Sequence, residues 1–178
     1  PLASITAMLE ALEDGLAEPY EYLPLLRDRA RALSAIVDDL FELARIDAGA
    51  ITEDMRWVAP SEIVDAARNR VEHTLRGRSL RLSVESDRLA RLDPRLTAAA
   101  LSQLLENAAQ YSPADLPIDV AATTNGGSLT IAVRDHGPGF DDEDLPHVFE
   151  RFYRSGSARS MSGSGLGLAI VRQAAEAH

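Results

Sequence analysis

The apolar residues before Gly49 repeat at helical spacing, whereas those after Gly49 alternate between strand and helix patterns. Spacings of three and four residues predict a helix from Leu2 to about Asp14. The segment from Gly15 to Pro19 interrupts the pattern, and Gly49 is typical of a residue that ends a helix. A near-heptad stripe indicates the second helix: Leu26, Ala30, Leu33, Val37, Leu40, Leu43 and Ala44. The first part of the chain is therefore predicted to form an αα-hairpin.

A lone helical hairpin buries little apolar surface, so this one needs a second surface to pack against. One interpretation is that it pairs with a second copy of the chain in a dimeric four-helix bundle. The other is that the hairpin packs on the rest of its own chain. The heptad character of the second stripe favours the dimer.

The chain after Gly49 predicts alternating strands and helices. Ile51–Val58 has the pattern of a first strand. A helix is expected from Pro60 to about Leu75, with Ser61 as its N-cap. Ser79–Val84 alternates as a second strand.

The dipeptide Asp93-Pro94 is a strong helix start, because the carboxylate caps the first turn and proline suits the first helical position. This helix is predicted to run to about Gln110. Alternating residues over 118–122 and 129–133 flank Asn125-Gly126, a pattern that predicts a β-hairpin.

A Gly- and Ser-rich loop is expected over 154–165, followed by a final helix over 166–177. Together these elements predict an α+β fold, in which a helical hairpin precedes helices that cover one face of a mixed sheet.

Composition narrows the possible partners and ligands. The formal net charge of -10 would repel a phosphate backbone, so no nucleic-acid partner is expected. The chain has no cysteine, and its four histidines lack zinc-ligand spacing. No apolar run approaches the roughly 20 residues of a membrane span, so no membrane contact is expected for this part.

Asn107 falls within a predicted helix, where asparagine is unfavourable because its side chain competes for backbone hydrogen bonds. This placement suggests that the carboxamide is directed at a ligand. An amide oxygen is a suitable ligand for Mg²⁺. The alternative is an ordinary surface asparagine near a helix end.

Asp135 follows a predicted strand and precedes Gly137 and Gly139. A carboxylate at a strand end can accept a hydrogen bond from an exocyclic amine such as that of adenine. The glycines allow the backbone to turn tightly against a flat ring. The alternative is a simple loop signature.

Three further glycines, Gly163, Gly165 and Gly167, open the last predicted helix. Without side chains, the backbone N–H groups can approach phosphates at a helix N-terminus. The pattern is neither a Walker loop nor a Rossmann fingerprint. Glycine-rich helix starts are also common without any ligand.

In this order and on these elements, the three clusters resemble the histidine kinase family of the GHKL ATPase superfamily. The opening Pro1–Ile5 resembles the stretch after the family's phosphoacceptor motif, and Asp39–Arg45 resembles the end of its second dimerisation helix. The four boxes of the family fall on the following residues: Asn107 (N box), Asp135, Gly137 and Gly139 (G1 box), Phe149–Arg154 (F box), and Gly163, Gly165 and Gly167 (G2 box).

The resemblance implies a Bergerat-type α/β sandwich that binds ATP and Mg²⁺. Asp135 would bind the adenine amino group and Asn107 would hold Mg²⁺. Gln103 stands where the family usually has a second asparagine and is the other candidate metal ligand. The remaining residues expected at ATP are Tyr111, Gly137, Gly139, Arg154, Gly163, Gly165, Leu166 and Gly167.

The resemblance also implies a reaction and two domains. An ATP-dependent protein-histidine kinase moves the γ-phosphoryl group of ATP to a histidine, and then to an aspartate of a response regulator receiver domain. Residues 1–49 would be the dimerisation and histidine-phosphotransfer hairpin, and residues 50–178 the ATP-binding domain with its last strands missing. No catalytic residue is expected in the chain, because the phosphoacceptor histidine is expected upstream of Pro1.

The expected partners are a second copy of the chain, bound through the hairpin, and the receiver domain. A cytoplasmic location is implied, with a parent protein anchored in the bacterial inner membrane. One alternative is a nucleotide-binding pseudokinase or scaffold, suggested by Gln103 and by Gln110, where the family often has lysine. Another is a different GHKL member, such as an ATPase clamp or anti-sigma-factor kinase, which the hairpin and F box argue against.

Overall fold

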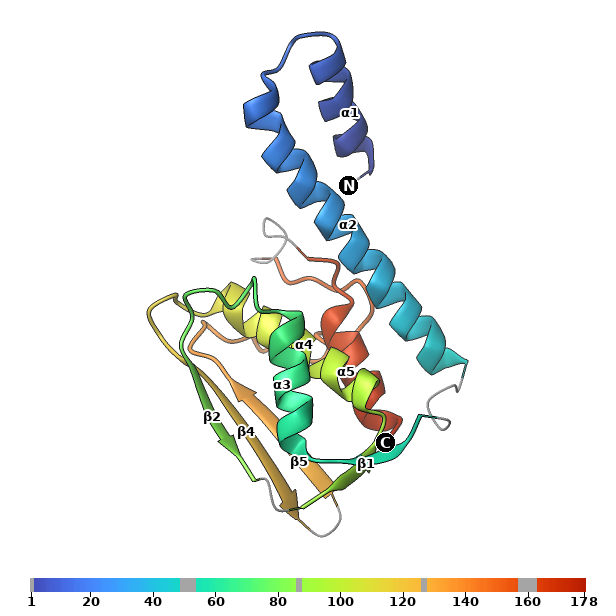
Figure 1. Cartoon of the computed structure of the whole chain (residues 1–178), viewed down its shortest axis with the longest axis vertical. Helices are drawn as coiled ribbons and strands as arrows, with labels where there is room; N and C mark the ends of the chain where they lie inside the picture. The colour runs from blue at the N-terminus through green and yellow to red at the C-terminus, as the bar shows by residue number, and fades with distance from the viewer. Residues whose placement is uncertain (1, 49–53, 86–87, 126–127, 157–162) are drawn as a thin grey trace.

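The computed structural model describes residues 2–48, 54–85, 88–125, 128–156 and 163–178 (Figure 1). Two helices come first, and the remaining elements alternate between strands and helices. In chain order the elements are α1 Leu2–Glu13, α2 Pro19–Asp47, β1 Arg56–Val58, α3 Pro60–Arg70, β2 Leu80–Val84, β3 Ala90–Leu92, α4 Pro94–Tyr111, β4 Ile118–Asn125, β5 Ser128–Arg134 and α5 Gly167–Glu176.

The predicted helical hairpin is present, and its two halves have different surroundings. α1 and the first half of α2 extend away from the rest of the molecule (Figure 1). Their large apolar side chains include exposed Leu9, Leu23 and Leu25. The second half of α2 instead packs on the chain's own domain, where Leu43 forms a buried cluster with Leu166 and Ile170. The interpretation that the hairpin packs on the rest of its own chain thus describes the second half of α2, and not α1 or the first half of α2.

The sheet is mixed, as predicted, and its helices lie on one face. β2 pairs in parallel with β4, and β4 pairs antiparallel with β5. β1 and β3 form a separate antiparallel pair. Helices α3, α4 and α5 lie on the same side of the three-stranded sheet (Figure 1). The largest core cluster joins α3, α4 and β4 through Ile63, Leu101, Leu105, Ile118 and Val120.

The start of α4 confirms the Asp93-Pro94 prediction. The Asp93 carboxylate accepts hydrogen bonds from the backbone N–H groups of Arg95 (2.9 Å) and Leu96 (3.0 Å). The prediction for α3 was wrong in one detail. Its N-cap is Ala59 rather than Ser61, because Pro60 takes the first helical position, and the Glu62 carboxylate accepts from the Ala59 N–H at 3.4 Å.

Element boundaries differ from the predictions at several points. α3 ends at Arg70, and the chain continues through turns toward Leu75. The short strand β3 has no clear sequence pattern and was missed. The predictions for Gly49, Gly126 and the first residues of the Ile51–Val58 strand lie outside the described residues. Within the described ranges, none of the helices is both long enough and apolar enough to cross a bilayer.

Candidate nucleotide site

Three candidate polar residues share one side of α4, because Gln103, Asn107 and Tyr111 are spaced by four residues. All three side chains are half-buried. Across the part of the chain that the structure describes, Asn107 has no side-chain hydrogen-bond partner. Its amide is therefore available to a ligand.

Gln103, Asn107 and Tyr111 are called the α4 stripe below. The loop after β5 packs against the C-terminal end of this stripe. The Asp135 Oδ1 atom accepts a hydrogen bond from the Gly137 N–H at 2.6 Å. The His136 N–H donates to the Ser112 hydroxyl at 3.2 Å. A Cβ at Gly137 would lie 2.9 Å from the Tyr111 carbonyl oxygen, so only glycine allows this approach. The exposed Asp135 carboxylate is thereby fixed close to the end of α4.

The start of α5 is seated against the other end of the stripe. A Cβ added at Gly167 would overlap the Gln103 carboxamide, so this glycine permits close packing of α5 on α4. Leu166 is fully buried, and its N–H donates to the Ser164 hydroxyl at 3.1 Å. The first backbone N–H groups of α5 have no partner within the helix, as at any helix start.

A backbone hydrogen bond joins the chain just before the predicted loop over 154–165 to the last residue of that loop. The Phe152 N–H donates to the Gly165 carbonyl at 2.8 Å. Both residues take left-handed conformations, with φ of 66° at Phe152 and 72° at Gly165. For Phe152 this conformation is strained. Residues 157–162 of the loop lie outside the described ranges.

The remaining predicted residues lie around these contacts. Gly139 and Gly163 are exposed, and a Cβ at either would meet no atom within 4 Å, although both have positive φ. Arg154 is half-buried near the base of the loop. The described contacts thus bring Gln103, Asn107 and Tyr111 together with Gly137 at one end of the stripe and Gly167 at the other.

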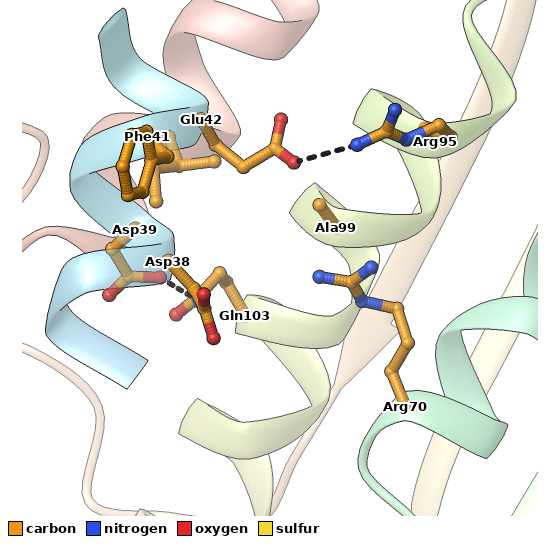
Figure 2. A pocket seen from close by; sticks show the side chains of 9 residues that line it. Asp38, Asp39, Phe41, Glu42, Arg70, Arg95, Ala99 and Gln103 are labelled. Atoms are coloured by element: carbon orange, nitrogen blue, oxygen red, sulfur yellow. Dashed lines mark hydrogen bonds and ion pairs between the residues drawn. The ribbon is translucent and has the colours of Figure 1, made fainter. Parts of the chain in front are cut away.

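Asp39 on α2 reaches this region although sequence reasoning did not assign it a role. Its Oδ1 atom accepts from the Gln103 amide at 2.8 Å, and its Oδ2 atom accepts from the Ser164 hydroxyl at 3.2 Å. Figure 2 shows Asp39 beside Gln103 and Glu42 facing Arg95. These four residues line a cleft of about 370 Å³. One signal was available, since Asp39 interrupts an apolar stripe of α2 between Ile36 and Leu43.

Burial raises the pKa of Asp39 above its ordinary value of 3.8, while hydrogen bonds from Ser164 and Gln103 oppose the change. Burial first, and then the nearby Asp39 charge, raise the pKa of Glu106 above 4.5. The folded state therefore binds these protons more tightly than the unfolded chain does. The two protonated carboxyl groups therefore add to the free energy of unfolding. This contribution is complete when the pH is below their pKa values in the unfolded chain, and it is lost as the pH rises through their raised pKa values in the folded protein.

The variant Asp39→Asn should therefore gain stability relative to the wild type as the pH rises from about 4 to about 7. Its amide can still accept from Gln103 but cannot ionise. Urea unfolding of both proteins at several pH values measures the difference. The exposed Asp28→Asn on the same helix is the control and should show no such trend. If the difference in unfolding free energy between Asp39→Asn and the wild type did not change with pH, the raised pKa of Asp39 would be contradicted.

Comparison with known proteins places these features in a family. The family described as "Histidine kinase-, DNA gyrase B-, and HSP90-like ATPase" (HATPase_c) matches residues 92–178. The family described as "His Kinase A (phospho-acceptor) domain" (HisKA) matches residues 1–49. A phosphoacceptor-type domain is therefore present at residues 1–49, as expected, and the comparison does not support the expectation that the chain lacks the phosphoacceptor itself. The histidines of the sequence are His73, His136, His147 and His178.

The similar proteins are sensor kinases. The sensor protein SphS of Synechococcus elongatus is 34% identical over the whole chain. The chain spans less than half the length of that relative (46%). The structure of the Acinetobacter baumannii histidine kinase AdeS is 24% identical with a TM-score of 0.79, over 99% of this chain and 84% of AdeS, which shows the fold.

A mycobacterial sensor histidine kinase, MprB, provides a solved structure of higher identity. It is 30% identical with a TM-score of 0.61, over 70% of this chain and 80% of the MprB chain. The order of the boxes, the mixed sheet and the preceding helical hairpin agree with both families that match. The chain belongs to the sensor histidine kinases of two-component signalling, with a HisKA and a HATPase_c domain.

Proposed function

We propose that this chain is the kinase core of its parent protein, and that it binds ATP with Mg²⁺ for transfer of the γ-phosphoryl group to a histidine. One observation carries the proposal: α4 holds the Asp135 loop at one end of its polar stripe and the start of α5 at the other. Asn107 lies between them, and its amide has no hydrogen-bond partner among the described residues. A carboxylate for the base, an amide for the metal ion and a helix start for the phosphates thus lie in a row along one side of α4.

The Asp135 carboxylate suits the adenine amino group. Its Oδ1 atom is held by the Gly137 N–H, while Oδ2 has no hydrogen-bond partner among the described residues. Oδ2 can therefore accept from an exocyclic amine. Gly139, with φ of 78° and open space around it, lets the following backbone turn beside the base.

The residues present fit Mg²⁺ bound jointly with phosphates. Among the described residues, no cluster of three His, Cys, Asp or Glu side chains could hold a metal ion alone. Mg²⁺ is commonly held by one or two protein ligands plus substrate phosphates, so the Asn107 oxygen is sufficient. Gln103 could become a second ligand only by turning from Asp39 and Gly167. When bound, the ion neutralises phosphate charge.

The start of α5 would receive the phosphates. The first N–H groups of α5, which have no partner within the helix, and the positive end of the helix dipole favour anions. Leu166 and Gly167 present this terminus, and Gly163 and Gly165 shape the chain leading to it. Tyr111 and Arg154 are the proposed phosphate-side contacts, because a guanidinium fork matches phosphate oxygens. Phosphoryl transfer depends chiefly on such positioning and charge stabilisation.

The wider assembly follows from the family. The domain boundary is proposed near Gly49, and the hairpin would dimerise with a second copy through its exposed apolar face. A response regulator receiver domain would take the phosphoryl group. The kinase core would lie in the cytoplasm, with its parent anchored in the inner membrane.

The second candidate function is a nucleotide-binding pseudokinase or scaffold. The hydrogen bond from the Gln103 NH₂ group to Asp39 favours it, because it holds the carboxamide in an orientation in which the oxygen, the atom that could bind a metal ion, lies against Gly167. Incubation of the parent protein with ATP labelled in its γ-phosphoryl group, followed by detection of label on the protein, distinguishes the two functions. Label on a histidine supports the kinase, whereas nucleotide binding without any label under varied Mg²⁺ and pH supports the pseudokinase.

The Asp135→Asn variant tests the adenine contact. Its amide oxygen should keep the hydrogen bond from Gly137, which directs the amide NH₂ toward the base. Two donors then face each other at adenine, whereas the NH₂ can donate to the O6 atom of guanine. We expect the preference for ATP over GTP analogues to fall by about tenfold or more. Competition binding measures it, with exposed Asp142→Asn as the control; an unchanged preference would remove Asp135 from the base site.

A further inference from the structure

The carbonyl groups at the end of α4 converge on one arginine from another part of the chain. The Arg78 Nη2 atom donates to the carbonyl oxygens of Ala109 (2.8 Å) and Ser112 (2.6 Å), with a longer contact to Ala108 (3.4 Å). Its Nη1 atom donates to the Pro113 carbonyl. The Ala108 carbonyl also accepts from the Ser112 N–H at 3.1 Å, and the Pro113 carbonyl from the Leu116 N–H at 3.3 Å. The negative end of the helix dipole favours a cation beside the carbonyls at a helix end.

The local backbone directs Arg78 to this position. Gly77 takes a left-handed conformation with φ of 81°, and no atom obstructs it within 4 Å. The Arg78 N–H then donates to the Leu75 carbonyl at 2.9 Å, which closes the turn between α3 and β2. The half-buried side chain thus lies under the end of α4. A guanidinium can serve several carbonyls at once because its donors form a rigid planar fork.

The same turn of α4 carries the Asp135 loop on its other side. The Tyr111 carbonyl abuts Gly137, and the Ser112 hydroxyl accepts from His136. Residues 108–113 are therefore held between Arg78 and this loop. Any shift of that turn would change the distance between Asn107, one residue before it, and Asp135.

We propose that Arg78 is a positioning residue of the nucleotide site, which sets the separation between the base-binding carboxylate and the metal-binding amide. The inference rests on the proposed function, since it assigns these two groups to ATP. Arg78 itself touches neither ligand. Without its guanidinium, the end of α4 would lose its fixed place beside the Asp135 loop.

Two variants and one control test the inference in the full chain. Arg78→Met removes the donors but keeps most of the apolar stem, and Arg78→Lys keeps the charge without the fork. Arg76→Met, exposed in the same segment, is the matched control. We expect Arg78→Met to bind an ATP analogue with Mg²⁺ about tenfold more weakly, Arg78→Lys to be intermediate, and Arg76→Met to be unchanged.

Affinities are measured well below each unfolding transition, where a loss of stability alone leaves the folded fraction, and hence the apparent affinity, unchanged. Wild-type affinity in folded Arg78→Met overturns the inference. If Arg78→Met does not fold, Arg78→Lys decides, and wild-type affinity in it also overturns the inference.

A second readout needs no nucleotide. Backbone amide NMR signals of His136 and Gly137 should shift in Arg78→Lys, and those of α1 should not. Unmoved His136 and Gly137 signals would overturn the positioning role. Failure of the wild type to bind any nucleotide, with these signals shifted as expected, would instead count against the proposed function and leave the structural coupling intact.

Discussion

Replacing Gly165 by alanine should destabilise the folded chain by about 2–4 kcal/mol. Gly165 has φ of 72°, a conformation that costs a side-chain-bearing residue about 1–2 kcal/mol. An added Cβ would also lie 2.8 Å from the Phe152 carbonyl carbon and from the Tyr153 carbonyl oxygen. These are backbone atoms and cannot move aside without breaking the hydrogen bond between Phe152 and Gly165.

Urea unfolding of the variant measures this loss. The control is Gly156→Ala, because Gly156 has no positive φ and no atom within 4 Å of an added Cβ. The control should change stability by less than about 1 kcal/mol. If Gly165→Ala were as stable as Gly156→Ala, the described closure at the base of the loop would be incorrect.

The Asp93→Ala variant should lose about 3 kcal/mol of unfolding free energy. Asp93 is fully buried at the start of α4, and its Oδ1 atom caps two backbone N–H groups. Its Oδ2 atom accepts from the Arg45 guanidinium at 3.0 Å, which joins α2 to α4. Alanine would leave the two N–H groups and part of the Arg45 guanidinium without their partner.

Asp93→Asn separates the two contributions, since its amide oxygen can still cap the helix but carries no charge for Arg45. We expect it to lose less than Asp93→Ala. The control is Asp65→Ala, which removes only an exposed ion pair with Arg68 at 3.5 Å and should cost less than about 1 kcal/mol. A loss below about 1 kcal/mol in Asp93→Ala would contradict the role of Asp93 as a buried cap.

The elements predicted best were those whose signals are local. The Asp93-Pro94 pair predicts the start of α4 without any distant contact, because the N–H groups that Asp93 caps lie only two and three residues after it. The strands around Asn125 were predicted from alternation, which reports burial on one sheet face. The Ser61 prediction failed because Pro60 was itself the first helical residue, so the cap moved back to Ala59.

The contacts that sequence reasoning missed join residues far apart in the chain. Arg78 binds carbonyls of residues 108–113, and any arginine in an exposed segment would have looked the same in the sequence. Asp39 meets Gln103 only because α2 packs on α4 and α5. The glycines at 137 and 167 were predicted for their closeness to a ligand. That stays a prediction. Sequence reasoning did not foresee that a Cβ added at Gly137 would crowd Tyr111 and Asp135, or that one added at Gly167 would crowd Gln103.

In the proposed function, the α4 stripe, the Asp135 loop and the start of α5 form one Mg²⁺-dependent ATP site. Calorimetric titration of the whole chain with a non-hydrolysable ATP analogue, once with Mg²⁺ and once with a chelator, tests it most directly. We expect saturable binding at a single site that weakens about tenfold or more without the metal ion. A demonstrably folded chain that binds no analogue in either condition would contradict it.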